Sequence, residues 1–249
     1  MPIPLQEGLV YGPLPSRRLG RSLGVNLLPG NRKVCNFSCP YCQYGWSPDP
    51  ATLRRLDWPS PSAVADAVAD ALARDAGIQN VTLAGNGEPT LHPGFAEVIE
   101  HLRVVRGRLA PGARIAVLSN SSTLGDRSVV SGLRRADDRY MKLDGGDDIT
   151  LRRLNGVKPD AGAIIEGLRR LDEVVIQSMF VKSDARIDNT TPGALDAWFE
   201  AIMRIRPSAV HVYSLDRSPA SRRLVAVPRQ ELEQIAARVT HAGIPARVF

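Results

Sequence analysis

The chain has 249 residues, of which 43% are hydrophobic, 5% aromatic and 23% charged, and its net charge is +6. This length is enough for one large domain with a buried core, which the low aromatic content predicts to be aliphatic. No apolar run approaches the ~18 residues that cross a bilayer, and the first residues lack the basic and apolar regions of a secretion signal. A cytoplasmic location is therefore expected, with no membrane partner. The basic charge says little about nucleic-acid binding, because nearly all of it is arginine spread along the chain.

Short apolar runs alternate with longer amphipathic stretches along the chain. Strands are predicted at 23–28, 81–84, 114–119, 140–143, 174–180 and 209–213. Helices are predicted at 61–74, 95–106, 127–135, 160–171, 192–204 and 229–242. This alternation predicts parallel β/α units in a single α/β domain over residues 1–249, with 1–22 as an N-terminal extension. Six units are too few for a closed eight-unit barrel, so an incomplete (β/α) barrel is expected, with a doubly wound sheet as the alternative.

All three cysteines of the chain, Cys35, Cys39 and Cys42, lie within eight residues. They open a long loop, 35–60, that follows the first predicted strand, where a fold of this kind binds its ligands. One interpretation is a set of buried structural thiols. A second is structural zinc, although zinc takes four ligands and the nearest downstream histidine is His92. The third, which this local density of cysteines favours, is an iron–sulfur cluster with one iron left open for a ligand.

Polar residues follow the later strands. Gly85, Gly87 and Glu88 come after the second strand, where glycines allow close backbone approach and a carboxylate can accept hydrogen bonds from an ammonium. The segment lacks the Gly-x-Gly-x-x-Gly pattern, which excludes a dinucleotide fingerprint. Ser119 and Asn120 end the third strand, and helix capping and ligand contact fit them equally well.

The fourth and sixth predicted strands end in further candidates. Lys142 and Asp144 share one face of the fourth strand, where a lysine suits a carboxylate and an aspartate suits ribose hydroxyls. The alternative for this pair is a solvated lysine followed by an aspartate turn. Tyr213 ends the sixth strand and could form a wall for an adenine ring.

The Cys-x-x-x-Cys-x-x-Cys spacing, with the aromatic Tyr41 before the last cysteine, resembles the signature of the radical S-adenosylmethionine (SAM) superfamily. The resemblance implies a partial barrel of six units and a [4Fe-4S] cluster on Cys35, Cys39 and Cys42, with SAM chelated at the open iron. It also implies one-electron cleavage of SAM to methionine and a 5′-deoxyadenosyl radical. An electron donor such as flavodoxin or ferredoxin is then an expected partner.

The segment from Gly85 to Glu88 is similar to the Gly-Gly-Glu motif of that superfamily, which contacts the methionyl amino group of SAM. Asn86 replaces the first glycine of the pair. The residues expected to contact the cofactor are Tyr41, Gly85, Gly87, Glu88, Ser119, Asn120, Lys142, Asp144 and Tyr213. No residue is assigned a catalytic role on the substrate.

Four longer segments, 11–24, 85–93, 142–155 and 213–219, resemble compact proteins grouped with the wyosine synthases of transfer RNA. Those synthases carry a second cluster on three further cysteines, and this chain has none left. A single-cluster enzyme that abstracts hydrogen from an unidentified substrate is therefore expected. The alternatives are a cluster-stabilised RNA-binding or tRNA-modification accessory protein and an activase that makes a glycyl radical on a partner.

The N-terminal extension contains three closely spaced arginines, Arg17, Arg18 and Arg21. They could meet an anionic substrate, whether a small molecule, a nucleotide or transfer RNA. They could equally pair with carboxylates and hold the extension in place.

Overall fold

A computed structural model describes residues 3–30, 32–48, 56–183 and 187–249. Part of the predicted loop 35–60, residues 49–55, lies outside the described residues, as do the first two residues of the 1–22 extension. The main sheet has eight strands in the order β1-β2-β3-β4-β5-β6-β8-β10. Their bounds are Val10–Ser16, Gly20–Asn26, Asn80–Ala84, Arg114–Ser119, Asp138–Lys142, Val174–Met179, Ala209–Tyr213 and Ala246–Val248. A separate two-stranded sheet pairs β7 (Val181–Ser183) with β9 (Leu224–Ala226).

Seven α-helices and a short 3-10 helix, η2 (Pro89–Leu91), alternate with these strands in the described parts of the chain. The α-helices are α1 (Pro61–Arg74), α2 (Phe95–Leu109), α3 (Arg127–Arg135), α4 (Asp148–Asn155), α5 (Ala161–Arg169), α6 (Pro192–Ile205) and α7 (Arg229–His241). Side-chain caps fix several starts: Ser60 accepts from the N–H of Ala63 before α1, and Asp126 caps α3 in the same way. Most of the helices therefore begin where polar caps or prolines stand in the sequence, whereas α2 follows Gly94, which has no side chain to cap it.

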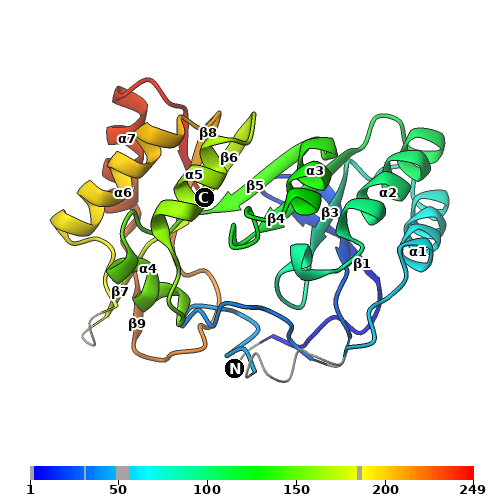
Figure 1. Ribbon diagram of the computed structural model, residues 1–249, viewed down its shortest axis with the longest axis horizontal. Coiled ribbons are helices and arrows are strands. Elements are labelled where there is room, and N and C mark those ends of the chain that lie inside the picture. The colour runs from blue at the N-terminus through cyan, green and yellow to red at the C-terminus, as the bar shows by residue number, and fades with distance from the viewer. Residues whose placement is uncertain (1–2, 31, 49–55, 184–186) are drawn as a thin grey trace.

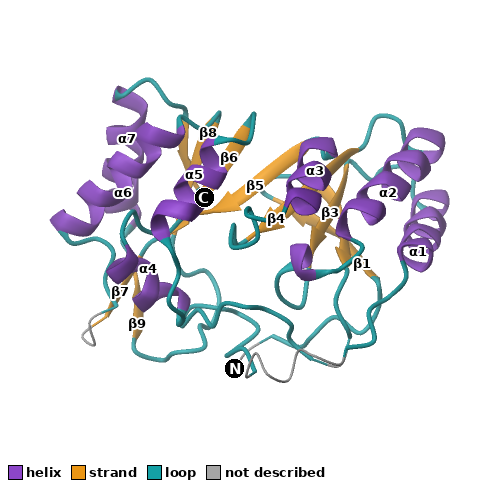
Figure 2. Cartoon of the chain, in the orientation of Figure 1, coloured by secondary structure: helices purple, strands orange, loops and turns teal. Residues whose placement is uncertain are grey.

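The strands of the main sheet follow one another in chain order, and every neighbouring pair from β2 to β10 is parallel. Right-handed crossovers between sequential parallel strands place all connecting helices on one face of the sheet. Figures 1 and 2 show α1, α2 and α3 along one end of the curved sheet and α5, α6 and α7 along the other. This arrangement confirms the predicted partial barrel and excludes the doubly wound alternative, in which the strand order reverses.

The main core lies between the sheet and these helices. Alternate strand residues enter it, as Ile176 of β6 and Val210 and Val212 of β8 do, all fully buried. The strand residues between them face the concave side of the sheet. There Ala116 and Tyr140 pack on Leu19, which lies in the turn between β1 and β2. The N-terminal hairpin therefore closes on the inside of the partial barrel.

Some bounds are shifted, as for the predicted strands 23–28 and 140–143, which lie at Gly20–Asn26 and Asp138–Lys142, and the following elements differ more. The strand β1 pairs antiparallel with β2, although the sequence predicts only an extension there. The tail 244–249 forms the edge strand β10, and α4 is an additional helix after β5. The predicted strand 174–180 ends at Met179, and the chain then enters the small sheet through β7. These elements are short or lie at an edge of a sheet, so their hydrophobic periodicity does not extend over enough residues to predict them.

Candidate active site

The three cysteines lie in a loop that follows β2 and is closed by its own hydrogen bonds. The N–H of Cys42 donates to the Cys39 carbonyl at 3.1 Å, and the Gly45 N–H donates to the Cys42 carbonyl at 3.0 Å. The Lys33 ammonium donates to the Gly45 carbonyl at 2.5 Å. Cys39 is buried, while Cys35 and Cys42 are half-buried. The loop thus has a defined conformation that brings the three thiols to the carboxyl ends of the parallel strands.

The N-terminal flank of this loop is joined to the end of β3 by backbone. The Val34 N–H donates to the Asn86 carbonyl at 2.8 Å, and the Glu88 N–H donates to the Val34 carbonyl at 2.9 Å. Gly87 has a φ of +149°, and a Cβ at this position would lie 1.8 Å from the Val34 oxygen. Gly85, at φ +117°, likewise lies against the Asn26 side chain. Both predicted glycines are therefore required by the close approach of two chain segments.

Glu88 continues this flank toward β4. The residue is only 2% exposed, and its carboxylate accepts from the Thr90 N–H at 3.1 Å, the Thr90 hydroxyl at 2.6 Å and the Asn120 N–H at 2.5 Å. Burial raises the pKa of Glu88, and these hydrogen bonds act against that rise. The Asn120 amide in turn donates to the Cys35 sulfur at 3.7 Å, and Ser119 beside it is buried. Glu88 thus orders the β4 loop next to a cysteine, and its predicted contact with SAM stays a prediction.

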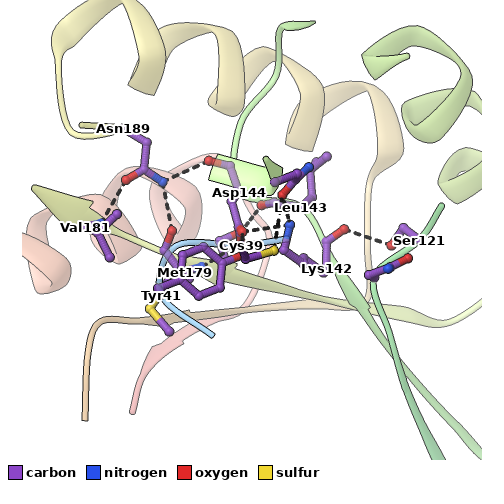
Figure 3. A network of polar contacts seen from close by, with 12 residues as sticks. Cys39, Tyr41, Ser121, Lys142, Leu143, Asp144, Met179, Val181 and Asn189 are labelled. Atoms are coloured by element: carbon purple, nitrogen blue, oxygen red, sulfur yellow. Dashed lines mark hydrogen bonds and ion pairs between the residues drawn. The ribbon is translucent and has the colours of Figure 1, made fainter. Parts of the chain in front are cut away.

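The C-terminal flank rests on buried charge from the end of β5 (Figure 3). Asp144 is fully buried, and its carboxylate accepts from the Tyr41 hydroxyl and from the Met179 N–H at 2.9 Å. The Lys142 ammonium lies 3.0 Å from the same carboxylate. Burial acts to lower the pKa of Lys142, but the Asp144 carboxylate, together with the charges of Cys39 and Cys35, more than offsets this, so the pKa is raised. The Asp144 carboxylate is thus surrounded by protein donors, and its predicted contact with ribose stays a prediction.

Lys142 and Cys39 meet at Asn155, the last residue of α4. The Asn155 amide oxygen accepts from the Lys142 ammonium and from the Cys39 thiol, the latter at 3.9 Å. The Asn155 carbonyl accepts from the Ser38 N–H at 2.8 Å. The next residue, Gly156, has a φ of +67° and approaches the Ser38 carbonyl so closely that a Cβ would lie 2.4 Å from its oxygen. The end of α4 is thus fitted against the cysteine loop, a contact that the sequence did not predict.

The remaining candidates lie on the concave face. Tyr213 is half-buried, and the Arg18 guanidinium lies 5.5 Å from its ring centre. Arg17 pairs with Asp216 at 3.0 Å, and Arg21 pairs with Asp75 at 2.5 Å. For these two arginines the structure matches the interpretation in which they hold the extension in place. Arg18 instead stacks on aromatic rings.

The donor set fits the cofactor that the cysteine spacing predicts. Three soft thiolate donors suit an iron–sulfur cluster and leave one iron of a cubane without a cysteine. Among the residues that the structure describes, no group of three or more His, Cys, Asp or Glu side chains is placed to hold a single metal ion. In a cubane each thiolate binds a different iron, so the three sulfurs need not converge on one point. Burial raises the pKa of Cys35 to about 12, so iron binding there must displace a thiol proton.

Comparison with known proteins identifies the family. Residues 33–183 match the family model "Radical SAM superfamily". The chain is 30% identical to the UPF0026 protein slr1464 of Synechocystis over 95% of its length and 82% of that protein. Two other curated relatives are matched over 33% and 52% of their own lengths.

Solved structures share the fold. A radical SAM methyltransferase from Sphaerobacter thermophilus superposes with a TM-score of 0.67 at 17% identity, covering 92% of this chain and 65% of that one. Archaeal TYW1 superposes with a TM-score of 0.61 at 16% identity, covering 89% and 72%. The chain thus spans slightly less than two thirds of the methyltransferase. In the described part of the chain, no helix is both long and apolar enough to span a membrane.

The family model covers the cysteine loop, the Gly87–Glu88 turn, the Asn120 loop and the Lys142–Asp144 pair, which are the segments that meet at the carboxyl ends of the strands. Members of this superfamily use a [4Fe-4S] cluster and SAM. The chain belongs to the Radical SAM superfamily and is an enzyme of that superfamily.

Proposed function

We propose that this chain binds one [4Fe-4S] cluster through Cys35, Cys39 and Cys42 and uses it to abstract hydrogen from a substrate. When bound, the cluster and SAM supply one-electron cleavage of SAM to methionine and a 5′-deoxyadenosyl radical. The observation that carries the proposal is the cysteine loop itself. Protein hydrogen bonds hold both its flanks, which supports a defined position for this cysteine-bearing segment where a β/α barrel binds its ligands.

The residues around the loop have distinct proposed roles toward SAM. Gly87 and Glu88 bind the methionyl ammonium, because a glycine backbone and a carboxylate supply acceptors beside Cys35. Ser119 or Asn120 binds the methionyl carboxylate or the ribose. Tyr213, whose ring lies on the concave face, forms a wall for the adenine.

The branch and the partners are part of the same proposal. The segments 11–24 and 142–155 resemble those of proteins grouped with the wyosine synthases, but the three cysteines of this chain ligate a single cluster. The electron comes from a small carrier such as flavodoxin or ferredoxin. The substrate is an anionic molecule, because the Arg18 guanidinium lies 5.5 Å from the ring centre of Tyr213 and supplies a positive charge there.

The test is anaerobic reconstitution followed by SAM cleavage. Reconstituted protein is reduced with dithionite, given SAM and analysed for 5′-deoxyadenosine by liquid chromatography and mass spectrometry. Slow release without substrate is the expected result, with iron-free protein as the control. Protein that holds its cluster but cleaves no SAM would contradict the proposal, and tight RNA binding with a steep salt dependence would then favour an RNA-binding role.

A further inference from the structure

Lys142 and Asp144 form a buried ion pair beside the cysteine loop. The Lys142 side chain is 15% exposed and that of Asp144 is not exposed at all. Removing two charges from water costs free energy that their attraction seldom exceeds, so a well-packed apolar pair would give similar or greater stability. Stability alone therefore does not explain why charges occupy these two positions.

The contacts of the pair point to the cysteine loop (Figure 3). A single atom, the Asn155 amide oxygen, separates the Lys142 ammonium from the Cys39 sulfur. The Asp144 carboxylate lies on the other side of the Lys142 ammonium from Asn155 in this chain of contacts. It accepts a hydrogen bond from the hydroxyl of Tyr41, which belongs to the cysteine loop. The positive end of the pair is thus the end that lies toward a ligand of the cluster.

The surroundings of Lys142 fix this placement. Its ammonium lies 5.0 Å from the ring centre of Phe37 and 5.9 Å from that of Tyr41, and both rings belong to the cysteine loop. Aromatic faces attract a cation, and the attraction is stronger where water is excluded. Ser121 also donates from its hydroxyl to the Lys142 carbonyl at 2.8 Å, which holds the backbone of this residue.

We propose that Lys142 is a positioning and charge-compensating residue for the iron–sulfur cluster, in place of the contact with SAM that its position in the sequence predicts. Together with Asn155 it positions Cys39, and its ammonium stabilises the electron that the cluster gains on reduction. The inference rests on the proposed ligation by Cys35, Cys39 and Cys42. Net charge near a cluster sets its reduction potential, and a nearby cation favours the more negative, reduced form.

The experiment measures the potential of the cluster in the full chain without SAM. Lys142→Met, Asp144→Asn and the double variant are reconstituted anaerobically and titrated with dithionite, which supplies one electron per cluster. Electron paramagnetic resonance follows the reduced state, and iron content and circular dichroism are recorded for each variant. The matched control is Lys182→Met, because Lys182 also forms an ion pair, with Glu231 at 2.7 Å, but belongs to the small sheet.

Each outcome bears on the proposal. Lys142→Met should lower the midpoint potential, Asp144→Asn should raise it, and the double variant should lie between them, while the control matches the unmodified chain. A potential in Lys142→Met equal to that of Lys182→Met would overturn the proposal. If Lys142→Met does not fold, Asp144→Asn decides, and an unchanged potential there would be contrary to the inference. Failure of the unmodified protein to cleave SAM would count against the proposed function alone, because these potentials are measured without SAM.

Discussion

The two flanks of the cysteine loop are held by different kinds of interaction. On the N-terminal side, Val34 exchanges backbone hydrogen bonds with Asn86 and Glu88, and the close approach depends on the missing side chain of Gly87. On the C-terminal side, Tyr41 is held by the buried Asp144–Lys142 pair. The first flank depends on backbone shape and the second on charge. A change on the first flank should therefore act on geometry, and a change on the second on electrostatics.

Removing the cysteines should have the largest effect, which is the loss of bound iron. The same variant shows whether the two flanks hold the loop without metal. The triple variant Cys35→Ala, Cys39→Ala and Cys42→Ala should bind no iron, against about four irons for one cubane in the unmodified chain. It should nevertheless keep its fold, because the bonds on both flanks come from other groups. Iron analysis and circular dichroism check the two parts. A reproducible value near eight irons in the unmodified chain, or iron retained by the triple variant, would contradict single-cluster ligation by this loop.

Gly87→Ala tests the backbone flank. Gly87 forms an isolated parallel β-bridge with Val34. The added Cβ would lie 1.8 Å from the Val34 oxygen at a φ of +149°, so either this bridge must open or the end of β3 must move. Overpacking and backbone strain together should reduce the free energy of unfolding by about 3 kcal/mol, as measured by urea denaturation. Gly125→Ala is the matched control, because its Cβ would meet nothing within 4 Å. Equal stabilities of the two variants would show that the Val34–Gly87 bridge is not rigid.

The same contrast explains what could be predicted from the sequence. Long periodic segments, such as α1 at Pro61–Arg74 and β4 at Arg114–Ser119, were predicted with the bounds that the structure shows. The sequence singles out the glycines at positions 85 and 87 for close backbone approach to a ligand, whereas the structure places Asn26 and Val34 against them. That the three cysteines form one ligand set stays a prediction from their spacing.

The charged flank could not be predicted in the same way. The sequence places Lys142 and Asp144 on one face of a strand, but it does not tell whether that face meets a ligand or another loop. The partner Asn155 precedes Gly156, and this pair reads simply as a helix end. The available signal was that Lys142 ends β5 and that Asp144 follows it two residues later. Contacts between segments more than a hundred residues apart, such as that of Tyr41 with Asp144, depend on the tertiary fold.

Glu88→Ala should have a smaller effect than Gly87→Ala. It tests whether the N-terminal flank of the cysteine loop binds SAM. A hydrogen bond between an ammonium and a carboxylate is typically worth ~1.5–3 kcal/mol, which corresponds to roughly 10–100-fold weaker binding of SAM. Calorimetry on reconstituted protein measures the affinity, and iron content should stay the same. Glu97→Ala is the control, because Glu97 is an exposed residue of α2. Unchanged SAM affinity together with unchanged SAM cleavage would remove Glu88 from the cofactor site.

Tyr41→Phe should have the smallest effect and isolates one bond of the charged flank. The substitution keeps the ring that lies near Lys142 but removes the hydroxyl that donates to Asp144. Because Met179 and Lys142 still donate to the carboxylate, the loss should be about 1.5 kcal/mol, the lower end of the range for a hydrogen bond to a charged group. Tyr44→Phe is the matched control, since among the described residues the Tyr44 hydroxyl accepts a long hydrogen bond of 3.5 Å from the Gln6 amide. Urea denaturation of the two variants measures the difference. If Tyr41→Phe is no less stable than Tyr44→Phe, Asp144 does not hold the loop through Tyr41, and the charged flank would act on the cluster through Lys142 and Asn155 alone.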